Sequence, residues 1–138
     1  MEVTVAALAD HASLSDGKLN VLGVFDVINA HSVPAAHPRA VLVMRTLARN
    51  EDADKTVPME IRLEDEDGRL TFKAQGEHRI GPIPPGGFAT ANLIIELQNL
   101  PLPKFGHYAI VISLGGVEKI RLPLNVVELQ PPAGPAPA

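Results

Sequence analysis

GHYAIVISLGGVEKIRLPLNVVE, residues 106–128, carries the clearest fold signal in the chain: apolar side chains recur at every second position on both sides of a double glycine. A period of two is typical of extended strands with one buried face. A two-residue loop at Gly115–Gly116 would put the apolar faces of the two arms on opposite sides, whereas a three-residue loop aligns them. We therefore expect a three-residue, bulged turn with a glycine at positive φ. The predicted pairs are Ile112 with Ile120, Ile110 with Leu122, and Tyr108 with Leu124.

Two Asp-Gly pairs indicate further hairpins, because Asp and Gly tolerate the positive φ angles of a type I′ turn. Each is expected to form a two-residue loop that brings apolar side chains onto one face. Around Asp16–Gly17 the predicted pairs are Leu14 with Leu19 and Ala12 with Val21, and around Asp67–Gly68 they are Leu63 with Phe72 and Ile61 with Ala74.

The remaining apolar runs predict strands separated by Pro- and Gly-rich connections at 31–39, 80–87 and 99–104. We expect the segment Leu19–Ile28, apolar on both sides, to be a central strand covered twice. Short strands spaced by turns predict an all-β protein, an antiparallel β-sandwich of about seven to nine strands, immunoglobulin-like or jelly-roll-like. Besides the closing hairpin, the predicted strands are Glu2–Ala9, Leu19–Ile28, Ala40–Ala48, Thr56–Glu66, Arg69–Glu77 and Phe88–Leu97.

Length and composition predict one domain, residues 1–129, followed by a Pro/Ala-rich flexible tail, residues 130–138. The 138 residues are 46% hydrophobic and carry a net charge of -4, so nucleic acid is not expected as a partner. The absence of cysteine excludes a disulfide framework and a thiolate nucleophile. No apolar run is long enough to span a membrane, and we expect a cytoplasmic protein. The absence of tryptophan argues against a carbohydrate-binding platform.

A set of histidines and carboxylates in the first third of the chain is the one candidate metal or ligand site. In this interpretation Asp10, Asp26, His31 and His37 converge at one rim of the sandwich, with His11 nearby, and such groups bind metals or transfer protons. Their spacing does not place them on one face, and His31 and His37 are expected in a loop. The favoured interpretation is a polar rim, with no metal and no cofactor.

Three other features have simpler interpretations than a site. The four acids Glu64 to Asp67 lack the spacing of a calcium loop and are expected to form a solvated turn. Arg45, inside an apolar strand, is either an anion-binding group or a residue that reaches the edge and pairs there. The glycines lack the rest of a phosphate-binding loop, and the serines lack a nucleophile elbow, so no catalytic residue is predicted.

The first third of the chain resembles a family of small uncharacterised bacterial proteins, with a leading strand ending in Leu-Ala-Asp, a Gly-Lys-Leu-Asn hairpin, a Gly-x-Phe-Asp segment and a His-Pro. The closing hairpin with Gly106-x-Tyr108 is similar too. The resemblance implies a bacterial β-sandwich and carries no activity. The matching residues are Leu8, Ala9, Asp10, Gly17, Lys18, Leu19, Asn20, Gly23, Phe25, Asp26, His37 and Pro38.

These observations predict a non-enzymatic protein-interaction or structural module. We expect it to bind a protein partner or to self-associate, through an exposed sheet edge or an alanine-rich face. A small-ligand or metal-binding domain that uses the Asp/His rim is the alternative.

Overall fold

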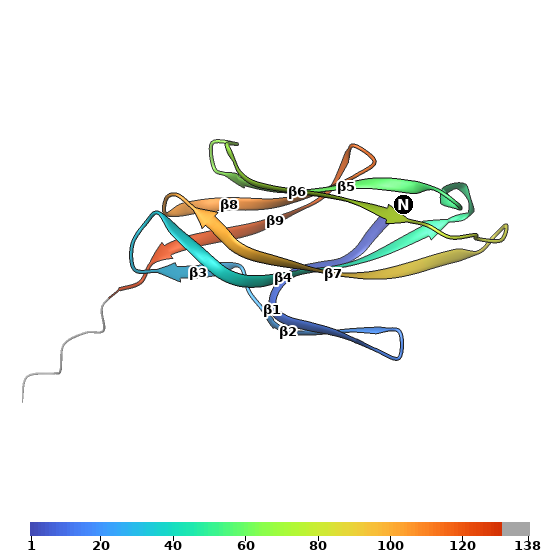
Figure 1. The fold of residues 1–138 in the computed structure, drawn as a ribbon, viewed down its shortest axis with the longest axis horizontal. Coiled ribbons are helices and arrows are strands. Elements are labelled where there is room, and N and C mark those ends of the chain that lie inside the picture. Colours follow the sequence, from blue (N-terminus) through green and yellow to red (C-terminus); the bar gives the residue numbers. More distant parts are fainter. Residues whose placement is uncertain (131–138) are drawn as a thin grey trace, which may run out of the picture.

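The computed structural model describes residues 1–130 as two β-sheets packed face to face (Figure 1). The expected tail, residues 130–138, lies almost wholly outside the described residues. Nine strands form the two sheets, in the orders β2-β1-β4-β7 and β3-β9-β8-β5-β6. Their bounds are β1 Glu2–Ser15, β2 Lys18–Val24, β3 Val27–Ala30, β4 Ala35–Arg49, β5 Thr56–Asp65, β6 Leu70–Arg79, β7 Phe88–Leu102, β8 Gly106–Leu114 and β9 Val117–Glu128.

The all-β prediction is confirmed. Within residues 1–130 the one helical element is a 3-10 turn at Asn50–Asp52, so no helix in this range is long and apolar enough to cross a membrane. All strand pairs are antiparallel except β3 with β9, which run parallel.

The main core lies between the sheets, where every second side chain points inward. Leu42 and Met44 of β4 and Ile110 and Ile112 of β8 are at most 1% exposed. Because strands of both sheets supply these side chains, neither sheet can bury its apolar face without the other.

The closing hairpin has the predicted pairing but not the predicted loop. Ile112 pairs with Ile120 and Ile110 with Leu122, as expected. The loop has two residues, Gly115 and Gly116, both at positive φ. The odd residue that aligns the apolar faces is a bulge in β9, since Ser113 pairs with Glu118.

The Asp67–Gly68 hairpin has a longer loop than predicted. Leu63 pairs with Phe72, as predicted, but the register shifts at Glu64 and the loop has three residues. The Gly68 N–H donates to the Asp65 carbonyl, and only Gly68 adopts positive φ, which describes a type I turn with a glycine bulge.

The first hairpin has the predicted two-residue loop, with Asp16 and Gly17 at positive φ and Leu14 opposite Leu19. The prediction that Leu19–Ile28 forms one central strand is wrong. β2 ends at Val24, and after a bend at Asp26 the chain enters the other sheet as β3. β2 is therefore an edge strand, and the strand covered on both faces is β4.

The β1–β2 hairpin, defined here as residues 10–24, folds over the outer face of the β4–β7 sheet and forms a third layer (Figure 1). Beneath it Val41 and Val43 of β4 are 3% and 0% exposed, although they point away from the main core. Ala12, Leu19 and Val21 of the hairpin pack against them. Ala7, Ala9 and Ala12 of β1 lie in this cluster, and Ala6 packs against the main core, so these alanines form no exposed face.

Two expected connections are shorter than predicted. β4 begins at Ala35, so His37 lies in a strand rather than a loop, and the crossing between sheets is confined to residues 31–34. β7 continues to Leu102, and Pro101 pairs with Ala36 at its end. Proline does not end either strand, because it is tolerated at a sheet edge.

Tyr108 fixes the chain where it enters β8. Its side chain is 4% exposed, and its hydroxyl donates to the Lys104 carbonyl at 2.6 Å while accepting from the Lys104 N–H at 3.0 Å. A buried tyrosine bonded to backbone a few residues upstream is the tyrosine corner of Greek-key sandwiches.

Candidate binding surfaces

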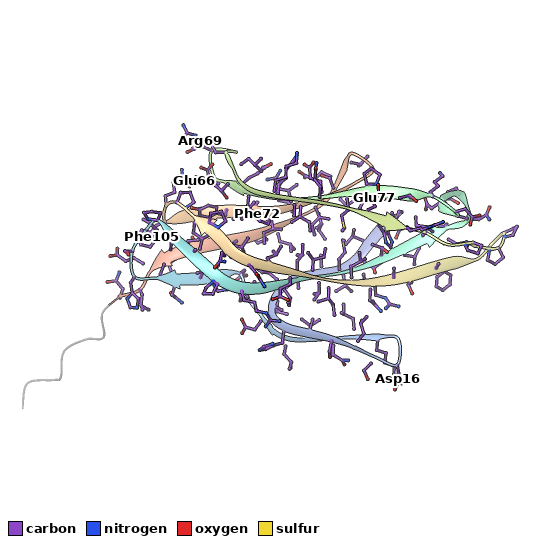
Figure 2. The ribbon with its side chains drawn as sticks, in the orientation of Figure 1. Asp16, Glu66, Arg69, Phe72, Glu77 and Phe105 are labelled. Atoms are coloured by element: carbon purple, nitrogen blue, oxygen red, sulfur yellow. The ribbon has the colours of Figure 1, made fainter. Side chains whose placement is uncertain are left out.

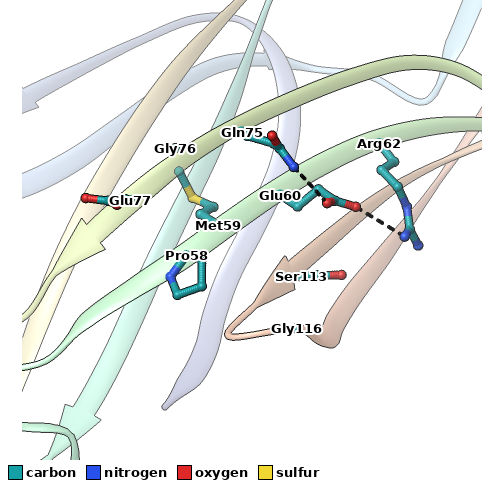
Figure 3. A pocket seen from close by; sticks show the side chains of 9 residues that line it. All are labelled: Pro58, Met59, Glu60, Arg62, Gln75, Gly76, Glu77, Ser113 and Gly116. Atoms are coloured by element: carbon teal, nitrogen blue, oxygen red, sulfur yellow. Dashed lines mark hydrogen bonds and ion pairs between the residues drawn. The ribbon is translucent and has the colours of Figure 1, made fainter.

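An open groove of about 670 Å³ lies on the outer face of the five-stranded sheet (Figure 3). It lies over β5 and β6, next to the β8–β9 turn. Charged and amide side chains line much of it, which suits a surface for contacts rather than an enclosed apolar pocket. Its lining residues are Pro58, Met59, Glu60, Arg62, Gln75, Gly76, Glu77, Ser113 and Gly116.

Glu60 is the central charge of this groove, and its partners are already in place. Gln75 donates to its Oε2 at 3.4 Å, and the ammonium of Lys73 lies 3.4 Å from the same oxygen. Arg62 Nη1 contacts Oε1 at 3.2 Å (Figure 3). The hydrogen bond from Gln75, helped by Lys73, lowers the pKa of Glu60 despite its partial desolvation. The carboxylate therefore stays ionised at neutral pH and is unsuited to act as a general acid.

The ion pairs continue across the sheet. Arg62 and Arg121 both contact Glu64, at 3.2 and 3.4 Å, and Arg121 reaches Glu118 at 2.8 Å. Val111 of β8 is flanked by Arg62 on β5 and by Arg121 on β9, each directly opposite it in the sheet. Val111 is fully buried, although its side chain points to the outer face. The aliphatic stems of the two arginines account for this cover. The network stabilises and seals this face of the sheet.

The acidic turn Glu64–Asp67 is more ordered than the predicted solvated turn. Asp65 is 8% exposed, and its Oδ1 accepts the N–H groups of Asp67 and Arg69 at 2.9 Å. Lys104 lies 3.6 Å from Asp65 and 2.9 Å from Asp67. Desolvation raises the pKa of Asp65, but the two N–H groups and Lys104 outweigh it, and the net pKa is lowered. Asp65 therefore stabilises the turn of this hairpin through its hydrogen bonds to the backbone.

The predicted Asp/His rim is only partly assembled. Asp10 and His37 line one shallow hollow with Phe25, whose ring lies 5.6 Å from that of His37. His31 lies in a neighbouring hollow shared with His37, and Asp26 in a third. Across residues 1–130 no three His, Cys, Asp or Glu side chains lie close enough together to hold a metal ion. Asp10 instead packs against Gly23, where a Cβ would lie 2.7 Å from Oδ2.

Arg45 does not present its guanidinium as a free anion-binding group. Nη1 donates to Asn92 Oδ1 at 2.8 Å and Nη2 to Thr90 Oγ1 at 3.2 Å, both on β7. Asn92 in turn donates to the Gly17 carbonyl at 3.1 Å. These hydrogen bonds attach the tip of the β1–β2 hairpin to the sheet that it covers. In Figure 2 the tip, marked by Asp16, lies far from the Glu66–Arg69 turn.

The outer side of the β1–β2 hairpin carries exposed apolar side chains. Leu22 and Val24 of β2 are 69% and 64% exposed. Leu14, which pairs with Leu19 on the inner side, is 54% exposed because it lies near the tip. β2 pairs on one side only, so its other edge is free. Sequence reasoning missed this surface because Leu22 and Val24 look like core positions in an apolar run.

The strand order identifies the class of sandwich. β4 and β7 pair in one sheet and β9-β8-β5-β6 in the other, which matches strands B and E and strands G-F-C-C′ of the immunoglobulin arrangement, with Tyr108 as its tyrosine corner. The protein is thus an immunoglobulin-like β-sandwich with an added hairpin.

The family follows from the sequence. The model of a family of unknown function, DUF6941, matches residues 4–127, and the chain belongs to this family. A search of curated proteins found no match to this chain.

Solved structures with similar architecture include an immunoglobulin-like protein from Pseudomonas aeruginosa, 10% identical, with a TM-score of 0.44 over 91% of this chain and 95% of that one. Another is a β-glucuronidase from glycoside hydrolase family 2, 19% identical, with a TM-score of 0.39 over 64% of this chain. The chain spans only 10% of that enzyme's length. Both likenesses are too distant to bear on function.

Proposed function

We propose that this chain is a non-enzymatic protein-interaction module, in which the sandwich is a scaffold and the β1–β2 hairpin is the binding element. The observation that carries the proposal is the exposure of Leu22 and Val24, 69% and 64%, on a strand with a free edge. Neighbouring exposed apolar side chains mark interaction sites, and free backbone groups on an edge strand accept another strand.

The charged face of the other sheet supports the non-enzymatic part of the proposal. Its carboxylates are neutralised by neighbouring cations, and the pKa of Glu60 is lowered rather than raised. Catalytic acids and bases usually have pKa values shifted toward neutrality. The groove beside Glu60 is thus best interpreted as a stabilised outer surface.

The proposal can be tested by cross-linking and affinity capture with the full chain as bait. A double variant, Leu22→Asp with Val24→Asp, places two charges on the hairpin. The matched control, Leu70→Asp with Phe88→Asp, places two charges at residues that are 53% and 64% exposed on β6 and β7. We expect the hairpin variant to lose protein partners, including further copies of the chain, that the control keeps. Equal capture by both variants would refute the hairpin as binding element.

A further inference from the structure

We infer that the partner of the β1–β2 hairpin is a second copy of this chain, added edge to edge along β2 to give one continuous sheet across two molecules. The inference rests on the function proposed above and names its partner. It draws on the contrast among the four sheet edges, on the alternation of backbone groups along β2 and on charge complementarity.

Of the four edge strands in residues 1–130, β2 alone lacks an evident protective feature. β6 carries Lys73, Glu77 and Arg79, β3 is four residues long, and β7 carries Glu96 and, near its end, Pro101. Such charges, short lengths and prolines prevent edge-to-edge pairing. β2 has a single charge, Lys18, at its first residue. Its edge is suited to accept a strand.

The two-residue loop determines which backbone groups of β2 are free. Ser15 and Lys18 flank the loop and bond to each other, so alternate residues from Lys18 onward face β1. Leu19, Val21 and Gly23 therefore direct their N–H and C=O groups to the free edge. An antiparallel second copy can bond to these groups.

One register satisfies both the apolar and the charged side chains. If Leu22 lies on the two-fold axis, it faces the partner's Leu22, and Val21 exchanges hydrogen bonds with the partner's Gly23. In the same register Lys18 lies just past the end of the partner's β2, near the bend at the partner's Asp26. Both are exposed, and neither takes part in an ion pair within residues 1–130. A slip of two residues would lose this charge pair and the Leu22 contact.

Sedimentation velocity on the purified full chain tests the inference. We expect a dimer whose dissociation constant rises by about a hundredfold or more in Leu22→Asp, because two like charges then meet on the axis. The Leu70→Asp variant should dimerise like the wild type. A monomeric wild type would overturn the inference. Partner capture lost only in the hairpin variant would then leave the proposed function standing, and capture unaffected by that variant would refute both.

Cysteine cross-linking tests the register, and the chain offers a clean background because it has no cysteine. In Leu22→Cys the two cysteines face each other across the two-fold axis. The distance between their Cα atoms then falls within the range of about 4.4–6.8 Å that a disulfide spans. In the control Asn20→Cys, the two positions are four residues apart along the strands, about 13 Å, and out of reach. We expect rapid disulfide dimers from Leu22→Cys alone. Equal cross-linking of both variants, or of neither, would contradict the register.

Discussion

The sandwich and the hairpin that covers it use apolar residues in opposite ways. Between the sheets, side chains such as Leu42 and Ile112 are fully buried, and Tyr108 locks the chain with two hydrogen bonds. Under the hairpin the buried set is small, Ala9, Val41 and Val43, and one hydrogen bond from Asn92 holds the tip. The hairpin meanwhile exposes Leu22 and Val24. The difference indicates that the hairpin adds little to stability and is suited to contact something outside the domain.

The largest expected difference between the two regions is in stability. Leu42→Ala removes a fully buried side chain from the main core and should lower the free energy of unfolding by about 2–5 kcal/mol. Val43→Ala, equally buried but beneath the hairpin, should cost about 1–2 kcal/mol, because it removes less surface and the hairpin can settle. Urea unfolding measures both. Equal losses would mean that the hairpin is part of the core.

The two anchoring hydrogen-bond sets provide the next contrast. Tyr108→Phe leaves the N–H and C=O groups of Lys104 without their partner, and we expect a loss of about 1–3 kcal/mol in urea unfolding.

Asn92→Ala frees the exposed Gly17 carbonyl and also Arg45 Nη1, and both groups can bond to water instead, so the cost should be about 1 kcal/mol. Hydrogen exchange should then accelerate at the hairpin amides but not in β8. Acceleration in both regions would show that the hairpin does not open independently.

His78 links the sheets through a 3.2 Å hydrogen bond between Nε2 and Thr46 Oγ1. Burial lowers the pKa of His78, so protonation is easier in the unfolded chain than in the folded one. The stabilisation is complete above the ordinary value of 6.5 and is lost as the pH falls through and below it. We expect the free energy of unfolding to fall between pH 7 and 5.5, and His78→Gln to flatten this dependence. An unchanged slope in that variant would exclude His78 as its source.

The smallest effect is expected from divalent metals. Asp10 and His37 share a hollow, but no group of three potential ligands is assembled within residues 1–130. A thermal-shift series with Zn²⁺ or Ni²⁺ should leave the melting temperature unchanged. A shift removed by His37→Ala, with His107→Ala as the control, would restore the rim as a site.

The sequence predicted registers better than it predicted loops. Ile112 meets Ile120 and Leu63 meets Phe72 because each face must be wholly apolar or wholly polar, a requirement that alternation reveals. Whether a hairpin places an additional residue in its loop or in a bulge depends on local backbone geometry. The hairpin at Gly115–Gly116 therefore has a two-residue loop where three were predicted, and the hairpin at Asp67–Gly68 has three where two were predicted.

The third layer could not be predicted from alternation. Val21 and Leu22 are equally apolar, yet Val21 packs against β4 and Leu22 is exposed. Their environments differ because the hairpin folds over the sheet, so that one face of β2 packs on β4 and the other is exposed. The candidate site is thus a consequence of tertiary arrangement.

Hydrogen exchange at Val21 and Gly23, followed residue by residue as the protein concentration is raised, tests the β2 interface most directly. These N–H groups point to the free edge and gain a partner only when a second copy adds its β2. The account predicts that their protection increases with concentration, while protection in β8 stays constant. Fast exchange at both positions, independent of concentration, would contradict it.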